Sequence, residues 1–171
     1  MSKEYTFNPG DFVVYPAHGV GQVSERQTAS VGGQDVDLIA IQFTKDKLTM
    51  RIPSNDAMNK GLRSVATPAV MEAVVSTLGE KPKVKRLPWS KRSAEYVSKI
   101  SSGDPIALAE VVRDLYRDPA LANQTYSERQ LFEKAFSRLA PEYAVVQKIT
   151  EKEATIQLES VLQGNIEKIT T

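Results

Sequence analysis

The sequence contains no cysteine and a single histidine, His18, among its 171 residues. Without cysteine, a disulfide framework, a thiol nucleophile and a cysteine-ligated metal or iron–sulfur cluster are all excluded. One histidine also excludes the paired histidines of a common zinc site. We therefore expect neither a metal nor a cofactor.

Long apolar runs are also lacking. No stretch approaches the roughly 18 apolar residues that a membrane-spanning helix needs, and Met1–Tyr5 lack the apolar centre of a secretory signal. Hydrophobic residues make up 41% of the chain and charged residues 25%, a composition typical of a globular protein with one domain or two small ones. The expectation is a cytoplasmic protein that does not bind membranes.

An excess of positive charge is absent from the chain as a whole but present in one segment. The net charge is +1, yet residues 81–92 carry six basic side chains and no acidic one. We call residues 81–92 the basic segment. Its cations are Lys81, Lys83, Lys85, Arg86, Lys91 and Arg92.

The first 66 residues have the pattern of β structure. Gly32-Gly33 suits a tight hairpin between two strands. Several short strands with tight turns in so few residues are typical of a small β-barrel. Strands are predicted over residues 12–15, 21–25, 36–43, 47–53 and 63–65.

The remaining residues have the pattern of helices. Thr67-Pro68 and Asp104-Pro105 each combine an N-cap with proline at the first helical position. Ser90 and Ser127 are predicted to cap two further helices, and a last helix is predicted over residues 142–162. The helix after Ser90 is expected to bury Ala94, Val97 and Ile100.

These patterns predict an α+β protein with four parts. They are a β module over residues 1–66, a linking helix over 67–80, the basic segment with a helical domain over 81–163, and a flexible tail over 164–171.

His18 is the one candidate for acid–base catalysis. No nucleophile motif accompanies it, and a histidine in a Pro-Ala-His-Gly turn more often serves the turn itself. Gly19 and Gly21 follow a strand, as in a dinucleotide-binding loop, but the third glycine and the following helix are missing. We predict that the protein is not an enzyme; a cryptic activity that depends on His18 stays as a minor alternative.

The basic segment predicts nucleic-acid binding. Lys91 and Arg92 fall in the first turn of a helix, where the helix dipole disfavours cations, so a functional reason for them is expected. Trp89, the only tryptophan, lies beside them; it is either a packed corner residue or a side chain that stacks on a base or enters a groove. Pro82 and Pro88 stiffen the segment and so lower the entropy lost on binding.

The stretch 47–53 is a second candidate surface. Its alternation places Lys47, Thr49 and Arg51 on one face and Leu48, Met50 and Ile52 on the other. At a sheet edge this strand could accept a partner strand. An ordinary exposed face, on which the two cations discourage aggregation, is the alternative.

Five stretches of the chain carry a family resemblance. They are Phe7–Val23, Leu48–Pro53, Pro88–Arg92, Ser102–Pro105 and Glu110–Tyr116. In this order they resemble the CarD family of bacterial transcription regulators, in particular its CdnL-type members, up to about residue 162. The N-terminal module alone is also similar to the polymerase-interacting domain of transcription-repair coupling factor.

The resemblance implies a function for both candidate surfaces. The N-terminal module would be a Tudor-like barrel, related to SH3 barrels, that binds the β subunit of RNA polymerase by edge-strand contact. Arg51 would be its main polar anchor, with Lys47, Thr49 and Met50 nearby.

The helical domain would contact promoter DNA at the upstream edge of the melted region, in a complex with the primary sigma factor. Trp89 would wedge into the minor groove, with Lys91 and Arg92 on the backbone and Lys85 and Arg86 close by, and so stabilise the open complex.

Two departures from the family pattern concern these surfaces. Ala29 lies where some relatives have an arginine before the hairpin, and Ala94 lies where some have a base. A monomer is expected, since no apolar heptad indicates a dimer. The alternative function is that of a small RNA-binding barrel of the ribosomal or elongation type.

Overall fold

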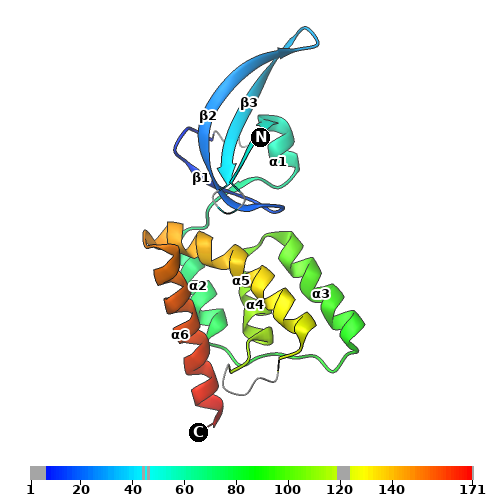
Figure 1. Cartoon of the computed structure of the whole chain (residues 1–171), viewed down its shortest axis with the longest axis vertical. Coiled ribbons are helices and arrows are strands. Elements are labelled where there is room, and N and C mark those ends of the chain that lie inside the picture. Colours follow the sequence, from blue (N-terminus) through cyan, green and yellow to red (C-terminus); the bar gives the residue numbers. More distant parts are fainter. Residues whose placement is uncertain (1–6, 44, 46, 119–123, 171) are drawn as a thin grey trace. The chain divides into compact units, whose positions relative to one another are not determined.

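The computed structural model describes residues 7–43, 45, 47–118 and 124–170. The chain divides into two compact units, Met1–Val65 and Ala66–Thr171 (Figure 1). The first, here called the sheet unit, is mainly β structure, and the second, the helical unit, consists of helices. The predicted α+β fold class is confirmed.

One antiparallel sheet of five strands forms the sheet unit. Its order is β4-β3-β2-β1-β5, so that β4 and β5 form its two edges. The stretch 47–53 therefore does lie at a sheet edge. The strands are β1 (Phe12–Tyr15), β2 (Gly19–Val31), β3 (Gln34–Phe43), β4 (Leu48–Pro53) and β5 (Arg63–Ser64).

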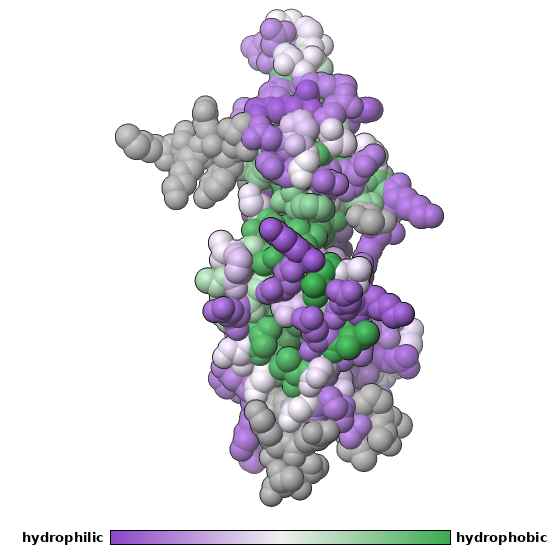
Figure 2. All heavy atoms as spheres, turned by 90° about the vertical axis from the view of Figure 1, so that its left-hand side faces the viewer, coloured by the Kyte–Doolittle hydropathy of each residue, from purple (hydrophilic) through white to green (hydrophobic). Residues whose placement is uncertain are grey.

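Strand β2 is much longer than the predicted 21–25. It pairs with β3 as far as Val31 opposite Gln34, and Gly32 and Gly33, with φ of 61° and 82°, make the predicted hairpin turn. The far half of the β2–β3 hairpin extends as an arm (Figure 1), and its hydrophilic surface dominates the top of Figure 2. Because both faces of the arm meet water, its sequence lacks the half-buried alternation by which strands are recognised.

The core of the sheet unit lies on one side of the sheet. It includes Val13, Val23, Ile41 and Phe43, and it is closed by a short helix, α1 (Ser54–Asn59), which buries Ala57. The sequence did not predict α1, because a single turn and a half without a side-chain cap leaves no periodic signal.

Gly19 and Gly21 serve the sheet rather than a ligand loop. Gly19 has a φ of 81° at the turn into β2. A Cβ on Gly21 would lie 2.6 Å from Ile41 Cγ2 and 2.9 Å from Phe43 Cδ1, so β2 can pass over the core only without a side chain there. His18 packs beside Tyr15 and Phe43, with ring centroids 5.8 and 5.2 Å away.

Among the described residues, five helices form the helical unit around a second core. Met71, Val74 and Leu78 of the first helix belong to this core, so the predicted linking helix is in fact part of the domain. The helices are α2 (Pro68–Leu78), α3 (Trp89–Ser102), α4 (Pro105–Leu115), α5 (Tyr126–Gln147) and α6 (Glu151–Thr170).

Two predicted helix caps are confirmed and two are wrong. Thr67 and Asp104 accept bonds from the amides of Val70 and Ile106. Helix α3 instead begins one residue before Ser90, after an N-cap at Pro88. Helix α5 is capped by Thr125.

The bounds of the predicted last helix were also wrong. Helix α5 continues through Pro141 to Gln147, and α6 begins at Glu151, where the Thr150 hydroxyl accepts a bond from the Glu153 amide. Helix α6 then runs past Gly164 to Thr170, so residues 164–170 of the predicted flexible tail are helical. Among the described helices none has the length and apolarity that a membrane crossing needs.

Candidate functional site

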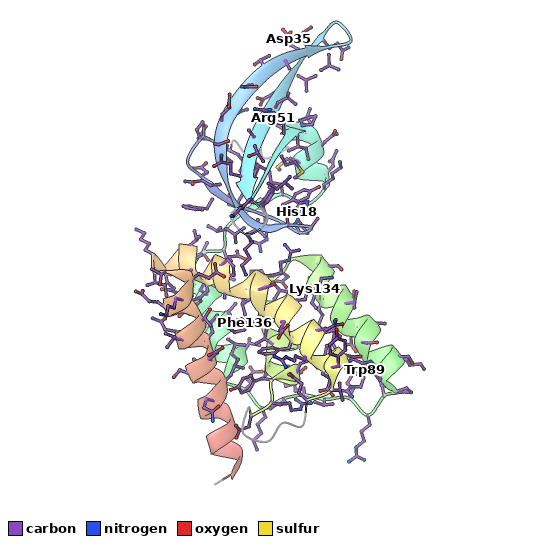
Figure 3. The ribbon with its side chains drawn as sticks, viewed as in Figure 1. His18, Asp35, Arg51, Trp89, Lys134 and Phe136 are labelled. Carbon is purple, nitrogen blue, oxygen red and sulfur yellow. The ribbon has the colours of Figure 1, made fainter. Side chains whose placement is uncertain are left out.

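Strand β4 presents the first candidate surface. Arg51 lies opposite Ala40 of β3 and Thr49 opposite Gln42, and within the part of the chain that the structure describes the sheet continues on one side of β4 only. Lys47, Thr49 and Arg51 are exposed, whereas Ile52 is buried (Arg51 is labelled in Figure 3). Met50 is half-buried, and Leu48 is 39% exposed because it lies at the end of the strand, beyond the core.

An open hollow lies at the start of β4. The residues that line it are Gln22, Gln42, Phe43, Lys47, Leu48 and Thr49. The structure thus brings Lys47 and Thr49 together, while Arg51 lies further along the same face, outside this lining. No acidic side chain is among its lining residues.

The basic segment runs from the end of α2 to the start of α3. Trp89 is the first residue of α3, and its ring is half-buried, 6.3 Å from the ring of Tyr96 and packed against the helical core (Figure 3). The position of Trp89 is therefore compatible with both interpretations, a packed corner residue and a ligand contact. Part of its ring packs against the helical core, and the rest is open to solvent.

Arg92 stacks on the same aromatic pair. Its guanidinium carbon lies 5.5 Å from the centroid of Trp89 and 6.0 Å from that of Tyr96, within cation–π range. Its Nε is buried and has no hydrogen-bond partner among the described residues. Arg92 therefore holds the tryptophan ring in place.

The candidate cations differ in whether an acidic side chain of the protein already pairs with them. Lys85 Nζ lies 2.8 Å from Glu95 Oε1. This hydrogen bond raises the pKa of Lys85 and lowers the pKa of Glu95 from their ordinary values. Arg86 and Lys91 are exposed, and no ion pair of theirs occurs within the described part of the chain.

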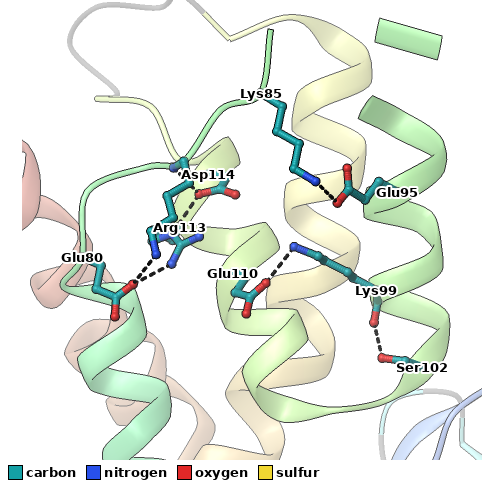
Figure 4. Close-up of polar contacts among 9 residues, drawn as sticks. Glu80, Lys85, Glu95, Lys99, Ser102, Glu110, Arg113 and Asp114 are labelled. Atoms are coloured by element: carbon teal, nitrogen blue, oxygen red, sulfur yellow. Dashed lines mark hydrogen bonds and ion pairs between the residues drawn. The ribbon is translucent and has the colours of Figure 1, made fainter. Parts of the chain in front are cut away.

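Acidic side chains that sequence reasoning missed surround the basic segment. Besides Glu95, Glu110 pairs with Lys99 at 2.7 Å, and Asp114 lies at the buried end of α4 (Figure 4). A cavity of about 20 Å³, large enough for one water, opens among Lys83, Lys85, Arg92, Glu95, Tyr96, Lys99 and Asp114.

The predicted apolar face of α3 was wrong. Ala94 and Val97 are exposed, and only Ile100 is buried. The buried face instead follows Trp89, Tyr96 and Ile100, at positions i, i+7 and i+11 of the helix. This spacing was visible in the sequence, but the assumed start at Ser90 left Trp89 outside the helix.

A metal centre does not emerge from these side chains: among the described residues no three His, Asp or Glu are grouped so that they could hold an ion. The site elements are an exposed edge strand in one unit, and a half-buried tryptophan among cations in the other. The two candidate binding surfaces thus lie in different units.

Two family models match the two units. The model described as CarD-like/TRCF RID domain matches residues 7–66, and the CarD C-terminal domain matches residues 73–159. The chain therefore belongs to the CarD family, a family of transcription factors, as the sequence motifs predicted. The domain that the first model describes is an RNA polymerase-interacting domain.

A curated protein resembles most of the chain, and a solved structure resembles about a third of it. "Putative transcription factor YdeB" of Bacillus subtilis (strain 168) is 27% identical over 147 residues, which cover 86% of this chain and 96% of that one. The solution NMR structure of the 72-residue N-terminal domain of Myxococcus xanthus CarD is 29% identical, with a TM-score of 0.31. That match covers 34% of this chain and 79% of that one.

Proposed function

We propose that this protein regulates transcription initiation by binding RNA polymerase with its sheet unit and promoter DNA with its helical unit. The polymerase is the form that carries the primary sigma factor, and the contacted part is its β subunit. The open edge of β4, with three exposed polar side chains on one face, is the observation that carries the proposal.

The sheet unit would add a strand of the β subunit to the edge of β4. In such pairing, main-chain hydrogen bonds supply affinity and alternate side chains supply specificity. Arg51 is the main polar anchor, because its guanidinium offers a planar fork of donors to a carboxylate, with Lys47, Thr49 and Met50 flanking it. Ala29, which lies opposite Val36 on the arm, offers no charge, so this contact depends strongly on Arg51.

The helical unit would bind at the upstream edge of the melted promoter DNA. The exposed part of Trp89 enters the minor groove there, while Lys91 and Arg86 contact backbone phosphates. Arg92 acts mainly by holding the Trp89 ring, which lowers the entropy cost of inserting it. Lys85 contributes once it leaves Glu95, and Ala94, exposed on α3, adds no charge.

A wedge of this kind stabilises the open complex by selective binding. A base step at the edge of melted DNA is already partly unstacked, so inserting Trp89 there costs less than in closed duplex. The equilibrium between closed and open promoter complexes can shift only by the difference between the protein's affinities for the two DNA states.

The lifetime of the promoter open complex tests this mechanism. Trp89→Ala is expected to shorten the lifetime, while Trp89→Phe, which keeps an aromatic ring, is expected to retain part of the effect. Co-purification with RNA polymerase and the melting temperature serve as controls. An equal loss of polymerase binding in Trp89→Ala would show that Trp89 is only structural and would overturn its role as a wedge.

If the sheet unit bound RNA and did not bind polymerase, the alternative function, a small RNA-binding barrel, would be favoured. A competition experiment with the full chain distinguishes the two functions. The proposed function predicts that polymerase retains the protein and that added RNA does not displace it.

A further inference from the structure

Two adjacent charged residues at the end of α4 are almost completely buried. Arg113 is 4% exposed and Asp114 is 3% exposed. Charged side chains are rarely buried unless they are paired, and losing one partner leaves a buried charge uncompensated. Arg113 Nε donates to Asp114 Oδ1 at 2.8 Å, so the two form a buried ion pair.

This pair is tied to the beginning of the basic segment at two points. Arg113 Nη1 donates to Glu80 Oε2 at 3.0 Å, directly after α2 (Figure 4). The backbone amide of Lys83 donates to Asp114 Oδ1 at 2.9 Å. A buried carboxylate thus fixes the main chain two residues before Lys85 and six before Trp89.

The far end of the segment is fixed by different contacts. Trp89 packs on Tyr96 and the helical core. Between the two ends, Val84 and Leu87 are 44% and 42% exposed and Arg86 is exposed, so little burial holds this stretch. A tight turn, in which the Leu87 amide donates to the Lys85 carbonyl, is its backbone contact.

We propose that Asp114, oriented by Arg113, is a positioning residue for nucleic-acid binding by the basic segment. It acts through the Lys83 amide, which sets the path of residues 84–88 and therefore the places of Arg86 and the Lys85 head group. Without this bond the segment keeps its charge but samples many conformations, and binding must then pay the entropy of ordering it. The inference rests on the proposed function of the helical unit.

The Lys83 amide can be removed without touching the buried charges. Lys83→Pro eliminates the N–H that Asp114 accepts, together with the lysine cation. Lys83→Ala eliminates only the cation and is the matched control. These two variants leave Asp114 unchanged, whose substitution could prevent folding. Asp114→Asn, which changes the acceptor of the bond, is a second test once its melting curve shows a folded protein.

Two readouts on the full-length chain decide the matter. The first is the rate of limited tryptic cleavage after Lys85 and Arg86, which we expect to be about tenfold faster in Lys83→Pro than in Lys83→Ala, the factor that corresponds to one lost hydrogen bond. The second is the apparent affinity for promoter DNA in the polymerase complex, expected to be about tenfold weaker in Lys83→Pro than in the control.

Each outcome has one meaning. Equal cleavage in the two variants would overturn the role of the Asp114 bond in holding the segment. Faster cleavage with equal DNA affinity would overturn its role in binding. If the wild-type chain itself makes no DNA contact that depends on Trp89, the proposed function fails, while the cleavage comparison still decides whether Asp114 fixes the segment.

Discussion

Lys85 Nζ and Glu95 Oε1 are 2.8 Å apart, so a residue of α3 neutralises a cation of the basic segment. The Lys85 side chain is 62% exposed and the Glu95 side chain 37% exposed, and ion pairs this accessible to solvent are weak. A DNA phosphate can therefore replace Glu95 as the partner of Lys85 at small cost. Under the proposed function, Glu95 therefore competes with DNA phosphates for this cation.

Glu95→Gln is predicted to strengthen DNA binding. Freeing Lys85 should raise the affinity for DNA about threefold at low salt. It should also steepen the slope of log K for DNA binding against log salt concentration by up to about 0.9. The matched control is Glu133→Gln, which breaks the exposed Arg129–Glu133 pair on α5 and changes the net charge equally. Equal gains in both variants would contradict a specific role for Glu95 and indicate a general charge effect.

The Lys85–Glu95 contact should also show in the titration of Glu95. The hydrogen bond from Lys85 lowers the pKa of Glu95 below its unfolded value, so its contribution to stability is complete above an ordinary pKa of about 4.3 and is lost as the pH falls through the lowered value. The raised pKa of Lys85 keeps the lysine charged well into the alkaline range.

NMR titration of the Glu95 carboxyl measures this directly. Lys85→Ala is expected to move the pKa of Glu95 upward, toward its ordinary value. Asp37, whose pKa is lowered by its hydrogen bonds from Arg26 in the sheet unit, should not respond to this change. An unchanged pKa of Glu95 in Lys85→Ala would show that the contact does not persist in solution.

The start of α5 offers a stability test that separates two neighbouring residues. The Thr125 hydroxyl accepts a bond from the Glu128 amide at 3.2 Å and donates to Glu128 Oε1 at 3.1 Å, so Thr125 caps the helix. Thr125→Ala is expected to lower the free energy of unfolding by about 1 kcal/mol. Ser127→Ala, inside the first turn, should change it by less than about 0.5 kcal/mol. Urea denaturation gives both values, and the reverse order would contradict the observed cap.

The fold was predictable wherever local chemistry decides it. Thr67-Pro68 and Asp104-Pro105 begin helices as predicted, since a capping side chain and a proline act within one turn. The cap of α5 was predicted at Ser127, but Thr125 supplies it. Both residues begin a capping-box pattern, so the pattern alone does not decide between them. A helix start was predicted at Glu142, but α5 continues through Pro141 to Gln147.

The candidate site was predictable in its residues but not in its pairings. The concentration of cations and the lone tryptophan located the basic segment, and the alternation of residues 47–53 located β4. The partners of these side chains come from elsewhere: Glu95 lies ten residues from Lys85, and Asp114 lies 31 residues from Lys83. Contacts at such separations depend on how the helices pack, which a single sequence does not reveal.

Retention by RNA polymerase tests the central claim most directly. Wild type, Arg51→Glu and Arg63→Glu should be compared by co-purification with polymerase from the same source. Arg63 lies on β5, the opposite edge of the sheet, so its reversal changes the charge equally without altering β4. We expect wild type and Arg63→Glu to be retained and Arg51→Glu to be lost, with similar melting temperatures for all three. Retention of Arg51→Glu, or failure of the wild type to bind, would contradict the account.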